Sequence, residues 1–307
     1  MTGGVPRLDA LEVRRTLRRA GLHASHARSQ NFLADPDVLE GILELADPAT
    51  GSRILEIGPG LGILTGGLLD AGAAVTAVEL DRNLVGYLRE LFEAPLALAD
   101  AAGSPGRALT PGGLTLIEGN ALDQQLSTLV PPPYEVVANL PYHITSPILH
   151  RLLGVAPRPS RLILMLQAEV AERIAAPPGQ MSYLSVFVQF HAAVRIAIRV
   201  RPESFEPPPK VASAVVVLEP RDPTRATDDH EEALWRLVQA GFRERRKMLR
   251  NVLGRQLPFD QARVDAGLAD AGIAGDRRPQ TLSVADWQRL LDMLPPIRDR
   301  GVSATMP

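Results

Sequence analysis

The fold class of this 307-residue chain is indicated by ten residues, Arg53-Ile54-Leu55-Glu56-Ile57-Gly58-Pro59-Gly60-Leu61-Gly62. The first five of these residues form a short apolar run typical of a buried strand, and the alternating glycines allow a tight turn into a helix. The turn does not match the dinucleotide-binding pattern G-x-G-x-x-G, because that pattern requires a third glycine at position 63, and this chain has Ile63 there. The stretch therefore predicts the first strand and the first ligand-binding turn of a doubly wound α/β domain.

Short apolar runs alternate with longer amphipathic segments from residue 51 to residue 219, which indicates a mostly parallel sheet covered by helices on both faces. We predict seven strands, at 53–57, 74–79, 114–118, 135–138, 161–167, 194–200 and 214–218. We predict helices between them at 61–71, 82–92, 144–153 and 168–175. Residues 202–210 join the last two strands and are too few for a crossover helix, so we expect an antiparallel pair there.

The remaining segments of the chain are predicted to lie outside this sheet. Residues 93–113 mix Ala, Gly, Pro and Ser without an apolar period, and we predict a surface insertion with no catalytic role. A linker at 220–229 leads into four predicted helices, at 231–242, 245–255, 260–271 and 284–294. We therefore predict two domains, residues 1–220 with a basic N-terminal arm and residues 221–307 as a small helical domain.

Composition excludes several classes of protein. The chain has no cysteine, and its six histidines lack metal-binding spacing, so we expect neither disulfides, nor a thiolate nucleophile, nor a metal. No apolar run reaches the roughly 18 to 20 residues of a membrane span. The N-terminal arginines are not followed by an apolar run of signal-peptide length. We expect a cytoplasmic protein with no membrane partner.

The charge pattern limits any nucleic-acid role to local clusters, because the formal net charge is only −2. One cluster consists of Arg14, Arg15, Arg18, Arg19 and Arg28. The other consists of Arg243, Arg245, Arg246, Lys247 and Arg250. Such runs more often form a solvated helix face than a binding surface.

Glu79 closes the second predicted strand, where a carboxylate can accept hydrogen bonds from the 2′- and 3′-hydroxyl groups of a ribose. The glycine loop after residue 57 lies at the end of the neighbouring strand. Each feature alone also suits a plain structural turn or a solvated strand end. Together, in this order, they fit S-adenosylmethionine.

Asn139-Leu140-Pro141-Tyr142 follows the fourth predicted strand, at the sheet edge where ligands bind. An adenine amino group is a poor nucleophile because its lone pair is delocalised into the ring. The Asn139 side-chain oxygen and the main-chain carbonyl of Leu140 or Pro141 can accept hydrogen bonds from this amino group and aim its lone pair at a methyl sulfonium. Tyr142 can stack on a base that has left its helix. We interpret the tetrapeptide as a site of amino methyl transfer that needs no general base.

These motifs together resemble the ribosomal RNA adenine N6-dimethyltransferases, most closely those of the 16S small-subunit RNA, from about residue 29 to residue 290. The resemblance implies an α/β fold, the Rossmann-like class I S-adenosylmethionine methyltransferase plan. This plan has a seven-stranded sheet with helices on both faces, here with a small C-terminal helical domain for rRNA contact.

The resemblance also assigns roles to residues. The implied cofactor contacts are Asn31, Leu33, Gly58, Gly60, Glu79, Asn120 and Asn139. The implied catalytic residues are Asn139, Leu140, Pro141, Tyr142 and Phe205, the last on the other face of the target base. On composition alone, Phe205 would more often be a core aromatic. The run 242–251 resembles the family's basic helix. The family usually has aspartate where Asn120 stands, against the cofactor adenine; Asn120 can still form one bond, and Asp123 is a nearby substitute.

The resemblance implies an enzyme that dimethylates N6 of two adjacent adenosines near the 3′ end of 16S rRNA, within the immature 30S subunit. Phosphate contacts from the two basic clusters would make binding salt-sensitive, and we expect a monomer. The nearest alternative is the related 23S rRNA methylase of macrolide resistance, although residues 276–287 look more like the 16S enzymes. A non-catalytic RNA-binding or assembly factor is a second alternative. A nicotinamide dehydrogenase is a third, which Ile63 argues against.

Overall fold

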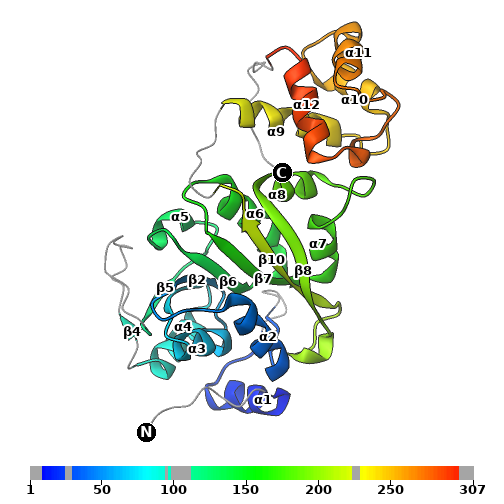
Figure 1. Ribbon diagram of the computed structural model, residues 1–307. Helices are drawn as coiled ribbons and strands as arrows, with labels where there is room; N and C mark the ends of the chain where they lie inside the picture. Colours follow the sequence, from blue (N-terminus) through cyan, green and yellow to red (C-terminus); the bar gives the residue numbers. More distant parts are fainter. Residues whose placement is uncertain (1–8, 25–29, 94–95, 98–111, 223–228, 297–307) are drawn as a thin grey trace. The chain divides into compact units, whose positions relative to one another are not determined.

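The structure is a computed structural model that describes residues 9–24, 30–93, 96–97, 112–222 and 229–296 (Figure 1). The chain divides into two compact units, Met1–Glu172 with His191–Arg225, and Arg173–Phe190 with Ala226–Pro307. The second unit thus includes residues 173–190, which the sequence prediction placed with the first domain. Most of the predicted insertion at 93–113, most of the linker at 220–229, and Arg28 lie outside the described residues.

The first unit is built on one mixed sheet with the strand order β4-β5-β3-β2-β6-β7-β10-β8. The strands are β2 (Arg53–Ile57), β3 (Ala74–Glu79), β4 (Leu96–Ala97), β5 (Leu114–Glu118), β6 (Glu135–Asn139), β7 (Arg161–Gln167), β8 (Ala192–Val200) and β10 (Ser213–Pro220). All seven predicted strands are confirmed to within two residues, and β4 is an unpredicted addition at one edge. The predicted antiparallel pair is also confirmed, because β10 runs antiparallel to both β7 and β8.

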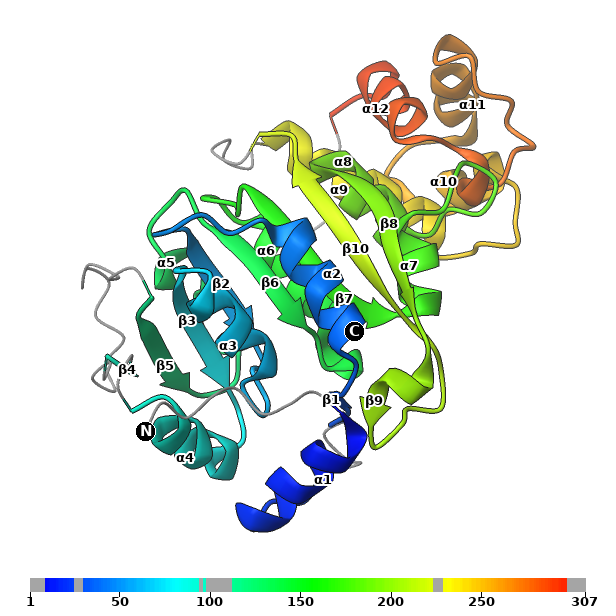
Figure 2. The same ribbon diagram turned by 60° about the horizontal axis from the view of Figure 1, so that its bottom comes forward.

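Helices cover both faces of this sheet, as predicted (Figure 2). They are α2 (Pro36–Ala46), α3 (Ile63–Asp70), α4 (Arg82–Leu91), α5 (Leu126–Leu129), α6 (Thr145–Gly154) and α7 (Ala168–Ile174). One core cluster joins α2, α3 and α4 to the side chains on one face of the strands. Figure 2 shows α6 behind the sheet, where its buried apolar side chains cover the other face. Because both faces are covered, β3 is buried at every position.

An N-terminal element that the sequence analysis did not predict packs beside the sheet. It consists of α1 (Ala10–Arg19) and β1 (Phe32–Leu33), which pairs with β9 (Phe205–Glu206) after the short turn η3 (Pro202–Ser204). The Asp9 carboxylate caps α1 by accepting from the Glu12 amide. Val13 and Thr16 face inward while the arginines face outward. The sequence analysis predicted a basic arm here because it considered the arginines and not the spacing of the apolar residues between them.

The strand order reverses beside β2, whose neighbours are β3 on one side and β6 on the other. Two parallel strands that lead away from such a point leave a crevice outside their carboxyl ends. The glycine loop follows β2, and Leu140 follows β6. The topology therefore brings the two predicted motifs to the same edge of the sheet.

The second unit is a helical bundle around Trp287, which is fully buried among leucines such as Leu234 and Leu253. Its elements are α8 (Tyr183–His191), α9 (Asp229–Phe242), α10 (Leu249–Gln256), α11 (Gln261–Asp270), η4 (Pro279–Thr281) and α12 (Val284–Met293). Three of the four predicted tail helices are confirmed to within two residues. The apolar run that forms α8 was not predicted as a helix.

The predicted helix at 245–255 is wrong at its start, because residues 243–247 form a turn and a bend and α10 begins at Leu249. Met248 is extended, with φ −64° and ψ 139°. The first helical amides find acceptors outside the helix, since Leu249 donates to the Arg277 carbonyl at 2.7 Å and Arg250 to the Gly275 carbonyl at 3.1 Å. These contacts satisfy amides that a longer helix would have bonded internally. The basic run is therefore a turn between α9 and α10.

Candidate active site

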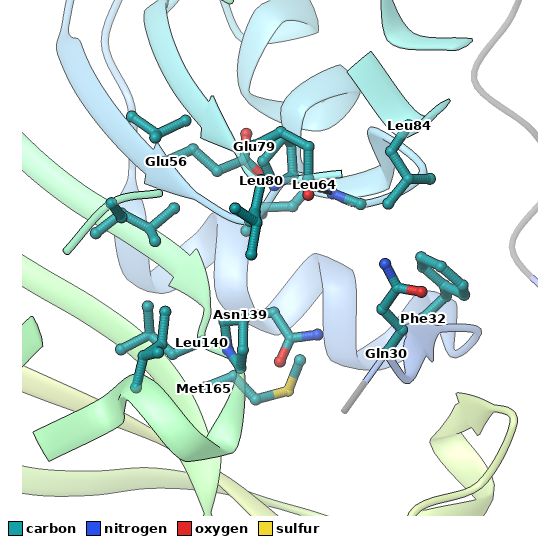
Figure 3. Close-up of a pocket in the computed structure, with 18 of the residues that line it drawn as sticks. Gln30, Phe32, Glu56, Leu64, Glu79, Leu80, Leu84, Asn139, Leu140 and Met165 are labelled. Atoms are coloured by element: carbon teal, nitrogen blue, oxygen red, sulfur yellow. Dashed lines mark hydrogen bonds between the residues drawn. The ribbon is translucent and has the colours of Figure 1, made fainter. Parts of the chain in front are cut away.

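A cavity of about 350 Å³ opens at the carboxyl ends of the central strands (Figure 3). It is lined by every predicted site residue except Phe205, namely Asn31, Leu33, Gly58, Gly60, Glu79, Asn120, Asn139, Leu140, Pro141 and Tyr142. These residues come from five separate segments of the chain. The structure thus brings them together, while their individual roles stay predictions.

The glycine loop is shaped by three left-handed glycines, Gly58 at φ 73°, Gly60 at φ 58° and Gly62 at φ 76°. A β-carbon at Gly58 would lie 3.5 Å from the δ-carbon of Pro141. The loop after β2 and the tetrapeptide after β6 therefore form adjacent walls of one cavity. A β-carbon at Gly60 would lie 3.2 Å from two ring carbons of Phe32, so the loop also fits closely against β1.

Glu79 ends β3 inside the cavity and is only 6% exposed. Its Oε2 accepts from the Gly60 amide at 3.2 Å, and its Oε1 accepts from the Asp81 amide at 2.8 Å. Burial raises the pKa of Glu79, while these amide bonds oppose the rise. Each carboxylate oxygen has a second lone pair. Glu79 can therefore hold the glycine loop and still accept bonds from two ligand hydroxyl groups.

Glu56 is a cavity residue to which the sequence analysis gave no role. It is 1% exposed and accepts a hydrogen bond from the Thr65 hydroxyl at 2.7 Å. Burial raises the pKa of Glu56 to about 8; the Thr65 bond lowers it, and the charge of Glu79 raises it. An acidic residue inside the apolar run 53–57 was the signal that could have identified it. Two buried carboxyl groups in one cavity suit a cationic ligand, whose charge would favour their ionised forms.

Asn139 is the last residue of β6, and its side-chain NH2 group donates to the Asn31 carbonyl at 3.5 Å. This contact directs the amide nitrogen toward β1 and leaves the side-chain oxygen as an acceptor for a ligand. Figure 3 shows the Asn139 amide beside Met165 and facing the cavity.

The structure also distinguishes the carbonyls of Leu140 and Pro141, which the sequence left as alternative acceptors. The Pro141 carbonyl accepts from the Ile144 amide at 3.2 Å and from the Thr145 hydroxyl at 3.4 Å. Leu140 donates its amide to the Met165 carbonyl at 3.0 Å. Within the described part of the chain, no donor bonds the Leu140 carbonyl. It is therefore the better candidate to accept a ligand's amino group.

Tyr142 begins a short 3-10 turn, η2 (Tyr142–Ile144), and is half-buried in the cavity wall. Its hydroxyl lies 2.9 Å from the Ser213 hydroxyl. Burial raises the pKa of Tyr142, and the hydrogen bond with Ser213 lowers it. The exposed His143 lines the cavity next to it. Neither Ser213 nor His143 was identified from the sequence.

Phe205 is not placed where the sequence analysis expected it. It is 1% exposed and belongs to the main core cluster of the first unit. The pairing of Phe205 with Leu33 in the β1–β9 ladder turns its side chain into that core. In this structure Phe205 does not line the cavity. A contact with a bound base would require the side chain to turn outward.

Asn120 lines the cavity at the end of β5, where the sequence analysis placed it. Its side-chain oxygen accepts from the Leu122 amide at 3.0 Å, and its NH2 group donates to the Asp123 carboxylate at 3.1 Å. Asp123 does not line the cavity. It holds Asn120 in place and does not substitute for it at the cavity wall.

The basic turn, residues 243–247, lines a separate hollow of the second unit together with Phe242 and Gln280. Arg243 bonds the Gln256 side chain at 3.0 Å, and Glu244 pairs with Arg255 at 2.8 Å. Arg245, Arg246 and Lys247 have no acidic partner in the described residues. In α1, by contrast, Arg14 pairs with Glu206, while Arg15 and Arg19 both pair with Glu12. The basic turn is therefore the less neutralised of the two clusters.

Within the residues that the structure describes, no helix is long and apolar enough to cross a membrane. No group of three or more acidic, histidine or cysteine side chains in the same residues could hold a metal ion.

Comparison with known sequences gives a consistent result. Residues 23–295 match the family model described as ribosomal RNA adenine dimethylase. The chain is 44% identical to ribosomal RNA small subunit methyltransferase A of Anaeromyxobacter sp. (strain K), covering 90% of this chain and 95% of that one. It is 42% identical to the protein of the same name from Geobacter sulfurreducens, covering 89% and 96%.

Comparison with solved structures points to the same group. The crystal structure of the 23S rRNA methyltransferase ErmE matches with a TM-score of 0.65 and 28% identity, covering 86% of this chain and 99% of that one. A dimethyladenosine transferase from Plasmodium falciparum matches with a TM-score of 0.67 and 25% identity, covering 84% and 95%. The sheet order and these two neighbours establish the class I methyltransferase fold that the sequence predicted.

Proposed function

Because the chain belongs to the ribosomal RNA adenine dimethylase family, we propose that it dimethylates the N6 amino groups of two adjacent adenosines near the 3′ end of 16S rRNA. The reaction uses S-adenosylmethionine and serves the biogenesis of the small ribosomal subunit. One observation carries the proposal: the glycine loop after β2 and the tetrapeptide after β6 line a single cavity. A methyl donor and an acceptor amino group can therefore meet there.

The cavity residues fit S-adenosylmethionine. Glu79 would accept from the ribose hydroxyls, and the glycine loop would let the backbone approach the ligand. Asn120 would face the adenine, while Asn31 and Leu33 would close the cavity on the β1 side. The buried carboxyl groups of Glu56 and Glu79 match the positive charge of this cofactor. When bound, the cofactor supplies an electrophilic methyl group.

The tetrapeptide would hold the target base. The side-chain oxygen of Asn139 and the carbonyl of Leu140 would both accept from the adenine amino group, which orients its lone pair toward the cofactor side of the cavity. Tyr142 would stack on one face of the base, which must leave its own stack to enter. Phe205 would reach the other face only after turning out of the core. The amino group then loses its proton to water, so no general base is assigned.

The rRNA would be gripped through its phosphates, outside the cavity. Arg245, Arg246 and Lys247 are the best placed side chains because acidic neighbours do not neutralise them. The arginines of α1 would add weaker contacts. We assign the partner as the 30S subunit before its maturation is complete, and the working form as a monomer in the cytoplasm.

A choice between substrates tests this proposal. The purified protein is incubated with methyl-labelled S-adenosylmethionine and either 30S particles lacking the modification or naked 23S rRNA. We expect label in the 16S rRNA of the particles and none in 23S rRNA. Label in 23S rRNA alone would overturn the substrate assignment. Failure to bind the cofactor in a calorimeter would favour the non-catalytic assembly factor instead.

The 23S rRNA methylase remains the second candidate. It is favoured by the structural similarity to the 23S rRNA methyltransferase ErmE. The sequence relatives named for the small subunit are more similar to this chain, at 40–44% identity against 28%. This difference supports the 16S substrate.

A further inference from the structure

Tyr142 and Ser213 form a hydroxyl pair at the edge of the cavity. Their side-chain oxygens are 2.9 Å apart, although the two residues are 71 positions apart in the chain. Ser213 is only 1% exposed, and it does not line the cavity. Tyr142 is half-buried and does line it. The pair therefore links a cavity residue to a side chain that a ligand in the cavity does not touch.

The topology explains why Ser213 reaches this position. Because β10 runs antiparallel to β7, its first residue lies at the edge where β6 and β7 have their carboxyl ends. Ser213 is that first residue, and it is paired with Gln167 of β7 and with Val200 of β8. The preceding Ala212 accepts from the Ala168 amide at 2.9 Å. Ser213 is therefore held by strands on both sides and provides a fixed anchor.

We propose that Ser213 is a positioning residue for methyl transfer, which holds the Tyr142 ring in the orientation that stacks on the target base. This inference rests on the proposed function of the cavity. The Pro141 carbonyl, bonded by Ile144 and Thr145, fixes the backbone beside Tyr142. The ring can still rotate about its own side-chain bonds. Fixing its hydroxyl before the base arrives removes part of the ordering cost of binding.

The alternative is that Ser213 matters only for packing. A buried hydroxyl without a partner is costly, and each hydroxyl here satisfies the other. Loss of Ser213 would leave the Tyr142 hydroxyl unpaired and free to turn toward water. Loss of stability alone would lower the amount of folded enzyme and leave the kcat of each folded molecule unchanged. A double-mutant cycle measured in kcat therefore separates the two explanations.

The cycle uses S213A, Y142F and the double variant, with methylation of 30S particles as the readout. We expect S213A to lower kcat about three- to tenfold, the usual worth of one hydrogen bond, with cofactor affinity within about twofold. In the Y142F background, S213A should have no further effect on kcat. With Tyr142 intact, S213T keeps a hydroxyl at this position and should retain most of the turnover. Equal losses from S213A in both backgrounds, or a loss of cofactor affinity, would overturn the proposal.

Two controls complete the test. Ser185→Ala removes another fully buried serine, whose hydroxyl donates to the Arg173 carbonyl at 2.6 Å, and it should leave kcat unchanged. The second control needs no activity: NMR of labelled tyrosine in the free protein, which has only four tyrosines. S213A should shift the Tyr142 ring signals and leave the other three unchanged. Unchanged Tyr142 signals would overturn the positioning role. A Tyr142 shift in a protein that fails to methylate RNA would overturn the proposed function alone.

Discussion

At the level of single residues, the proposed reaction depends on two oxygen acceptors at the end of β6. Asn139 is oriented by its bond to the Asn31 carbonyl, and the Leu140 amide is fixed by the Met165 carbonyl. Both oxygens thus belong to residues that are held by a hydrogen bond at another atom. Such preorganised acceptors stabilise a transition state without moving during the reaction.

Asn139→Ala should lower turnover by about 100- to 1000-fold, because it removes an acceptor needed chiefly in the transition state. Cofactor affinity should stay within about threefold, since Asn139 is one contact among several. Single-turnover methylation and calorimetry measure the two quantities on the same protein. A variant that loses cofactor binding but keeps its turnover would contradict the role assigned to Asn139.

Glu56 gives a prediction for the dependence of stability on pH. Its folded-state pKa of about 8 lies above the ordinary value of 4.5. Between these two pH values the Glu56 carboxyl group keeps its proton in the folded protein and loses it in the unfolded chain. The contribution of Glu56 to stability is therefore greatest at low pH and is lost as pH rises through about 8. Glu56→Gln removes this loss and can still accept from Thr65.

We expect Glu56→Gln to be more stable than the unmodified protein by about 4 to 5 kcal/mol near pH 8.5, and by less than about 1 kcal/mol near pH 5. Urea unfolding at the two pH values measures this. Glu79, whose pKa is also raised by burial, leaves part of the pH dependence in place. Parallel stability curves for the two proteins would show that Glu56 does not titrate as described.

At the scale of elements, the site is made by loops that follow parallel strands. Three turns, after β2, β3 and β6, place their residues at one edge because parallel strands share a direction. The glycine loop is the turn after β2. Its three left-handed glycines could not be replaced without backbone strain.

Gly60→Ala tests the shape of this loop. The new methyl group would sit 3.2 Å from the Phe32 ring, at a φ of 58° that side chains rarely adopt. We expect a stability loss of about 1 to 2 kcal/mol and at least about tenfold weaker cofactor binding. Gly272→Ala is the matched control, with φ 68° and nothing within 4 Å. It should cost similar stability while leaving cofactor binding unchanged; equal cofactor affinities in the two variants would contradict the role of the loop.

The regular elements of the sheet could be predicted from sequence because apolar period and glycine punctuation are local signals. Asn139 and Glu79 were found because they end such strands. Contacts between distant segments left no local signal. The β1–β9 ladder, the Tyr142–Ser213 pair and the burial of Phe205 all depend on residues far apart in the chain. The start of α10 was misjudged for the same reason, since its first amides bond to residues 275–277.

Across the whole chain, the proposed catalytic cavity and the basic turn belong to different units. The cavity lies entirely in the first unit, and the basic turn lies in the second. With a net charge of −2, the protein has no global attraction to RNA. Local clusters must therefore supply the binding free energy that depends on salt.

Arg245→Ala combined with Arg246→Ala should weaken binding to 30S particles and reduce its salt dependence. Each lost phosphate contact lowers the slope of log affinity against log salt by about 0.7 to 0.9. Binding titrations at several salt concentrations measure the slope. Arg289→Ala is the control, because this arginine is already paired with Asp286. An unchanged slope in the double variant would show that the basic turn does not contact phosphate.

We propose that this cavity adds two methyl groups to N6 of each of two adjacent adenosines in 16S rRNA. Mass spectrometry of 16S rRNA digests, after incubation of unmodified 30S particles with the protein and S-adenosylmethionine, tests it most directly. We predict two neighbouring dimethyladenosines in one fragment near the 3′ end, and none with the Asn139→Ala variant at the same incubation time. Methyl groups on other atoms or bases, or equal modification by the Asn139→Ala variant, would contradict the claim.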